Sequence, residues 1–73
     1  MDTPAKKALY DNLEYNEDLA VRINYAVQHT KKADWIGNRI KEREVAYVVS
    51  RELADDSKLD EVMELVKNQY EYQ

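Results

Sequence analysis

The scarcity of Gly and Pro constrains the fold of this chain most. Its 73 residues contain one of each, so few positions favour the end of a helix or a tight turn. Turn-rich β structure draws on both residue types, whereas the abundant Leu, Ala, Glu and Lys favour helix. Thr3-Pro4 is a typical helix start, since the Thr hydroxyl can accept from free N–H groups and Pro at the first helical position loses no hydrogen bond. Asn16 and Asn38 are further candidate caps. The pattern therefore predicts helices separated by short links.

Apolar residues recur at helical spacing in four segments, which predicts helices over residues 4–14, 17–29, 38–54 and 58–70. The third stripe includes Ile40, and the fourth ends at Tyr70. Residues 45–49, Val-Ala-Tyr-Val-Val, also have strand propensity. Their flanks lack turn residues, so we expect helix there as well.

The apolar faces of four such helices can bury one another, so the sequence predicts an all-α fold, a compact bundle of four helices. There is no internal repeat and no long linker, which favours a single domain over residues 1–73. Ser57, followed by Asp60, resembles a capping box at the start of the last helix, and residues 71–73 are expected to fray. The chain has no Cys, so neither a disulfide nor a thiolate metal site can stabilise its small core.

Charge is unevenly distributed along the sequence, although the net charge is −4. Residues 29–51 hold six Lys or Arg against three Asp or Glu, whereas residues 52–73 hold two against seven. The basic middle can contact an acidic surface, or it can simply face the acidic end of its own chain or the solvent. No apolar run approaches the roughly 20 residues that span a bilayer, and the start is no signal peptide, so we expect a cytoplasmic protein without membrane contact.

The candidate partner-binding residues are the basic side chains of the central segment and the single Trp beside them: Lys31, Lys32, Trp35, Arg39, Lys41 and Arg43. Trp35 has two interpretations. It can fill the core with its N–H bonded to a nearby carbonyl, or it can be an exposed interface anchor. Six tyrosines exceed what so small a core needs, which favours some of them facing another protein.

Catalytic motifs are missing from the sequence. A single Gly cannot build a phosphate-binding loop, and the single His29 cannot form a two-His metal site. The acidic residues between positions 55 and 64 lack the alternating spacing and the turn Gly of a calcium loop. We therefore expect no enzyme activity from this chain by itself, and no catalytic, metal or cofactor-binding residue in it.

Several short motifs occur in a distinctive order: Ala8-Leu9-Tyr10-Asp11-Asn12-Leu13, Asn16-Glu17-Asp18-Leu19-Ala20, Asp34-Trp35, Gly37-Asn38, Lys41-Glu42-Arg43, Glu64-Leu65-Val66-Lys67-Asn68-Gln69 and Glu71-Tyr72. Together they resemble the C-terminal helical region of the restriction (R) subunit of type I restriction–modification enzymes. The resemblance runs from about Ala5 to Tyr72. It departs at Ile36, where members of that family often have a basic residue.

The resemblance implies a fragment from the C-terminal end of a larger subunit, whose other domains form a nuclease and an ATP-dependent DNA translocase that uses Mg. It implies that this helical region docks the R subunit onto the methyltransferase core, which is made of the modification and specificity subunits. No catalytic residue of the family has a counterpart here. Two alternatives remain open: an accessory domain that contacts duplex DNA beside the motor, and a structural module that packs on the motor.

Overall fold

Polar side chains cap the first three helices of the computed structural model, which describes residues 2–73. Thr3 caps α1 (Pro4–Asn12), Asn16 caps α2 (Glu17–Thr30) and Asn38 caps α3 (Arg39–Leu53). In each cap the side-chain oxygen accepts a hydrogen bond from the backbone N–H three residues later, at 3.3, 3.0 and 3.1 Å respectively. All three caps are as the sequence predicts.

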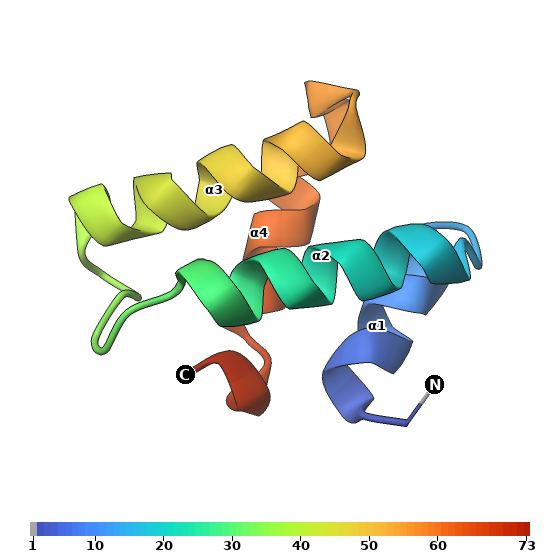
Figure 1. The fold of residues 1–73 in the computed structure, drawn as a ribbon, viewed down its shortest axis with the longest axis horizontal. Helices are drawn as coiled ribbons and strands as arrows, with labels where there is room; N and C mark the ends of the chain where they lie inside the picture. The colour runs from blue at the N-terminus through green and yellow to red at the C-terminus, as the bar shows by residue number, and fades with distance from the viewer. Residues whose placement is uncertain (1) are drawn as a thin grey trace.

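The remaining elements are the short turn η1 (Asp56–Lys58), helix α4 (Leu59–Lys67) and the final turn η2 (Tyr70–Tyr72). Residues 2–73 contain no strand. In Figure 1, α2 and α3 run antiparallel side by side, and α4 crosses behind them. Helix α1 packs against α2 and α4. The predicted all-α bundle of four helices is confirmed.

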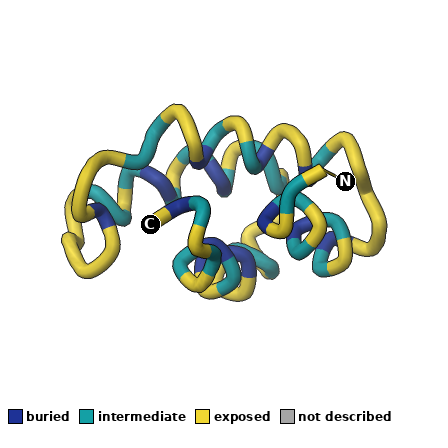
Figure 2. The backbone as a smooth tube through the Cα atoms, turned by 90° about the horizontal axis from the view of Figure 1, so that it is seen from below, coloured by how far each residue is buried: buried dark blue, intermediate teal, exposed yellow. Residues whose placement is uncertain are grey.

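The core lies between the inward faces of the helices, while exposed residues cover the outside of the bundle (Figure 2). Its largest fully buried side chains are Leu9, Ile23, Val27, Trp35, Val45, Val49, Val62, Val66 and Tyr72. Val45 and Val49 both lie on the inward face of α3. Residues 45–49, which also have strand propensity, are helical here because Val45 and Val49 lie four residues apart and both pack into the core.

Helix α1 ends two residues earlier than predicted. Glu14 and Tyr15 have positive φ angles of 59° and 64°, and the Tyr15 N–H donates to the carbonyl of Tyr10 at 2.9 Å. This bond, from the residue after a left-handed residue back to the last turn, closes a Schellman motif. The prediction was wrong because Glu14 occupies a position that Gly usually marks.

Helix α4 begins and ends differently from the prediction. It starts at Leu59 without a side-chain cap, and Asp55 rather than Ser57 supplies the capping oxygen, accepting from Ser57 N at 3.0 Å in front of η1. It ends at Lys67, and Tyr70 is 89% exposed in the separate turn η2. The expected fraying of residues 71–73 was also wrong, because Tyr72 is fully buried.

None of the helices within residues 2–73 combines the length and the apolar character that crossing a bilayer requires.

Candidate protein-docking site

The α2–α3 link, residues 31–38, turns its only Trp inward. Trp35 is 2% exposed, and its Nε1–H donates to the backbone carbonyl of Tyr72 at 2.7 Å. Of the two interpretations, the structure supports the core residue with a bonded N–H. The place of Trp35 among the partner-facing candidates is corrected accordingly, because a sealed indole offers no surface to a partner.

Two charged side chains from α3 fix the backbone of the link. Glu42 accepts a hydrogen bond from the Gly37 N–H and forms an ion pair with Lys67 of α4, with 3.2 Å between Nζ and Oε1. These two contacts lower the pKa of Glu42, the Gly37 N–H more than Lys67. Lys41 donates from Nζ to the carbonyl of Ala33 at 2.8 Å. The link is therefore tied to both α3 and α4.

The three candidate lysines are largely occupied or half-buried. Lys32 forms an ion pair with Glu44 at 3.0 Å, Lys41 bonds the link as described, and Lys31 is half-buried. Glu44 belongs to the basic segment itself, so this ion pair does not join the segment to the acidic end of the chain. Within residues 2–73 no ion pair connects a Lys or Arg of residues 29–51 with an Asp or Glu of residues 52–73. These lysines contribute less free charge to the surface than the sequence suggests.

The two candidate arginines behave differently from the lysines. Arg39 and Arg43 are exposed, and neither forms an ion pair within the part of the chain that the structure describes. They border two adjacent shallow hollows, one lined also by Ile40 and the other shared with Asp60 of α4. The structure therefore brings together Arg39 and Arg43 and separates them from Trp35.

Further residues extend this arginine pair along the outside of α3. Ile40 is 74% exposed and Tyr47 is 64% exposed, and the guanidinium carbon of Arg51 lies 5.7 Å from the centre of the Tyr47 ring. Residues 40, 43, 47 and 51 share one face, opposite the buried side of the helix, because they follow one another three or four positions apart. We call Arg39, Ile40, Arg43, Tyr47 and Arg51 the α3 outer face.

Sequence reasoning placed Ile40 in the core stripe of α3, which the structure shows to be wrong. It also missed Tyr47 and Arg51 as parts of a surface. Helix α3 has apolar residues on both its faces, so periodicity alone could not tell which stripe is buried. The three or four-residue spacing of Ile40, Arg43, Tyr47 and Arg51 was the available signal for a second face.

The acids of α3 are all paired with cations from other parts of the chain. Glu42 pairs with Lys67, Glu44 with Lys32, and Glu52 with Arg22 of α2 at 3.3 Å. Within residues 2–73, α3 therefore has carboxylates that are paired and arginines that form no ion pair. Its carboxylates face other parts of the bundle, and the α3 outer face is left cationic.

Other surface aromatics lie elsewhere. Tyr25 of α2 stacks on His29, with 3.9 Å between the ring centres, while Tyr15 and Tyr70 are exposed near the ends of other elements. Of the six tyrosines only Tyr72 is fully buried. Tyr47 is the exposed tyrosine that lies within the arginine cluster.

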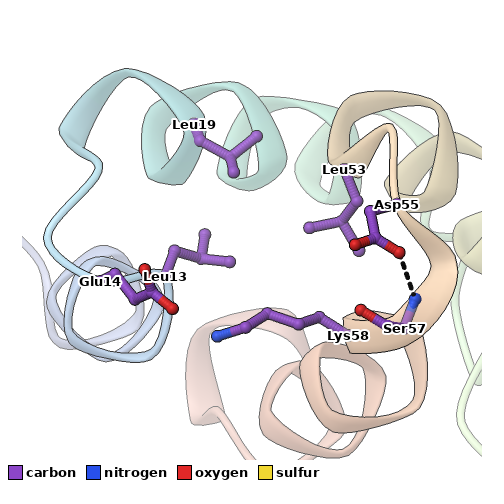
Figure 3. Close-up of a pocket in the computed structure, with 7 residues that line it drawn as sticks. All are labelled: Leu13, Glu14, Leu19, Leu53, Asp55, Ser57 and Lys58. Atoms are coloured by element: carbon purple, nitrogen blue, oxygen red, sulfur yellow. Dashed lines mark hydrogen bonds between the residues drawn. The ribbon is translucent and has the colours of Figure 1, made fainter.

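A hollow of about 200 Å³ lies between the α1–α2 connection, the end of α3 and η1 (Figure 3). Leu13, Leu19 and Leu53 line its apolar side. Lys58 reaches across it and donates to the carbonyl of Asn12 at 2.9 Å. The hollow therefore combines an apolar wall with a lysine whose ammonium group is already bonded.

Within residues 2–73 no three His, Cys, Asp or Glu side chains gather in an arrangement that could hold a metal ion. Comparison with known proteins finds no matching family, no matching curated protein and no matching solved structure.

Proposed function

We propose that this chain is a non-catalytic helical assembly module of a type I restriction enzyme. In this proposal it forms the C-terminal part of the R subunit and docks the ATP-dependent translocase and endonuclease onto the methyltransferase core. The partners are the modification and specificity subunits. The ordered sequence motifs suggest the family, and the surface of α3 supports the docking role.

One observation carries the docking role. The α3 outer face presents Arg39, Arg43 and Arg51 without an ion pair in the described chain, beside the exposed Ile40 and Tyr47. Arginine and tyrosine are the residue types enriched at protein interfaces, and here they occur together on one rigid helix.

The same arginines favour a second candidate function, in which the domain contacts duplex DNA beside the motor. Unpaired arginines can bind phosphates, and such binding would weaken steeply with salt. The net charge of −4 opposes this function at long range. We therefore rank it second.

A titration of the 73-residue chain separates the two functions. We expect binding to the purified methyltransferase core, and little binding to duplex DNA at physiological salt. Removing the module from the complete R subunit should abolish its recruitment to the core, while ATP hydrolysis by the remaining motor stays measurable. Normal assembly without the module would contradict the proposal, and salt-sensitive DNA binding without core binding would favour the second function.

A further inference from the structure

We infer that the α3 outer face is the surface through which the chain docks, and that it takes an acidic protein surface with an apolar recess between its carboxylates. This inference rests on the proposed docking function and goes further, because it names the face and the chemistry of the partner.

The geometry of the face defines what fits it. Arg43 and Arg51 lie eight residues apart on one helix, which places their backbones about 12 Å apart along its axis. Tyr47 lies between them and is 64% exposed. A partner that matches this face presents two carboxylate groups at a similar spacing, with an apolar recess for the tyrosine ring.

The charges of the molecule leave this face free for a partner. Every carboxylate of α3 pairs with a cation from outside the helix: Lys32 of the α2–α3 link, Lys67 of α4 or Arg22 of α2. Asp60 of α4 borders the same hollow as Arg39 and Arg43 but forms no ion pair with them in the described structure. The arginines therefore form no ion pair within residues 2–73, although Glu42 also lines this hollow, and their guanidinium groups are available to an acidic surface.

Other surfaces of the chain fit such a partner less well. Arg22 on α2 pairs with both Asp18 and Glu52, and Lys7 on α1 pairs with Asp11. The outside of α4 carries the exposed acids Asp60, Glu61 and Glu64. The α3 outer face is thus the part of the described surface where unpaired arginines and exposed apolar side chains coincide.

The apolar members of the face favour a protein over nucleic acid. Within residues 2–73 Ile40 is the second most exposed of the large apolar residues, at 74%, and an aliphatic side chain gains little from a phosphate backbone. Burying Ile40 and Tyr47 in a protein recess removes their surface from water, which stabilises a complex. Arginine then contributes bidentate hydrogen bonds to carboxylates.

Matched variants test the inference in the 73-residue chain. The double reversal Arg43→Glu and Arg51→Glu is compared with Lys7→Glu, a reversal on α1 at an exposed ion pair. Tyr47→Ala is compared with Tyr70→Ala, because Tyr70 is exposed but lies outside the face. Fluorescence of the buried Trp35 shows that each variant is folded before binding is measured.

We expect the double reversal and Tyr47→Ala each to weaken binding to the methyltransferase core by about tenfold or more, as at interface hot spots. Lys7→Glu and Tyr70→Ala should change it less than about threefold, as exposed residues outside an interface do. Equal binding by all folded variants would overturn the inference and leave the docking function in place. If the unaltered chain does not bind the core, the proposed function fails and the inference fails with it.

Two further outcomes would overturn the inference. One is that the double reversal reduces binding to duplex DNA but not to the core, which would make the face a nucleic-acid contact. The other is that the chain self-associates in sedimentation and that the double reversal abolishes this without affecting core binding. The face would then meet the acidic end of a second copy.

Discussion

At the scale of single residues, Trp35 explains most about the α2–α3 link. Its indole is buried, and its N–H bonds the Tyr72 carbonyl at 2.7 Å. The sequence suggested that the Trp35 N–H could bond a backbone carbonyl, but it did not identify the carbonyl of Tyr72, because the two residues lie 37 positions apart. A contact between segments so distant in the chain leaves no trace in local periodicity.

Replacing Trp35 with Phe tests that bond. The substitution leaves the carbonyl of Tyr72 buried without a donor, and it also removes part of a buried ring. We expect the free energy of unfolding to fall by about 1–3 kcal/mol. Urea denaturation followed by circular dichroism measures it, with Tyr70→Phe as an exposed control. Equal stability of Trp35→Phe and the unaltered chain would contradict the role assigned to the bond.

Two left-handed positions should respond to opposite substitutions. Gly37 has φ +88° and Ala54, which ends α3, has φ +62°. A Cβ added at Gly37 meets no atom within 4 Å, so the cost of Gly37→Ala is conformational. We expect Gly37→Ala to lower the unfolding free energy by about 1–2 kcal/mol, and Ala54→Gly to raise it by up to about 1 kcal/mol. Thermal melts of both variants check the signs, and equal signs would be inconsistent with these conformations.

At the scale of elements, the C-terminal turn η2 connects parts of the bundle that are distant in sequence. The Tyr72 hydroxyl donates to Asn24 of α2 at 2.6 Å, and Glu71 accepts from the Ala5 N–H in the first turn of α1 at 2.9 Å. Burial, with a smaller contribution from Glu71, raises the pKa of the Tyr72 phenol. The last residues are therefore structural.

Removing the Tyr72 ring should destabilise the whole bundle. Large buried aromatic residues cost about 3–5 kcal/mol when truncated to Ala. Small domains are stable by only about 5–15 kcal/mol, so Tyr72→Ala should leave little margin. Chemical denaturation measures the loss, and Tyr70→Ala, at an 89% exposed position, should change stability little. Similar stability of the two variants would contradict the anchoring of η2.

The connection between the α2–α3 link and α4 should depend on pH. Hydrogen bonding from Gly37 and the charge of Lys67 lower the pKa of Glu42 from its ordinary value of 4.5. The ionised form thus stabilises the fold above that ordinary value, and the contribution is lost as the pH falls through the lowered pKa.

Comparing the unaltered chain with Glu42→Gln from pH 7 to pH 3 isolates this contribution. The difference in unfolding free energy between the two proteins should shrink as the pH falls below about 4.5. Glu64→Gln serves as the control, because its carboxylate makes no hydrogen bond or ion pair in the described structure. A difference that stays constant over this range would exclude the stabilising role of the Glu42 carboxylate.

Local sequence patterns predicted where helices begin better than they predicted which face of a helix is buried. The caps Thr3, Asn16 and Asn38 were predictable because a cap involves only residues three positions apart. The end of α1 was not, because Glu14 adopts a left-handed conformation without the usual Gly. Ile40 was assigned to the wrong side, since either stripe of α3 satisfies helical periodicity.

At the scale of the whole molecule, the bundle has an apolar core and a charged surface on which paired and unpaired cations lie in different places. The basic segment seen in the sequence divides into Lys32 and Lys41, which bond within the chain, and arginines that are exposed along α3. This division is a property of the assembled fold, because it depends on where Glu44 and Ala33 lie. The docking proposal therefore depends on the arginines rather than on the Trp-bearing link.

Photo-crosslinking from the surface of the intact chain tests that proposal most directly. Benzoylphenylalanine is placed at Tyr47, on the α3 outer face, and in separate variants at Tyr25 and Tyr70, which are also exposed but lie on α2 and η2. The account predicts a covalent product between position 47 and a subunit of the methyltransferase core, and none from position 70. Crosslinks from positions 25 or 70 alone, with the chain bound and position 47 silent, would contradict it.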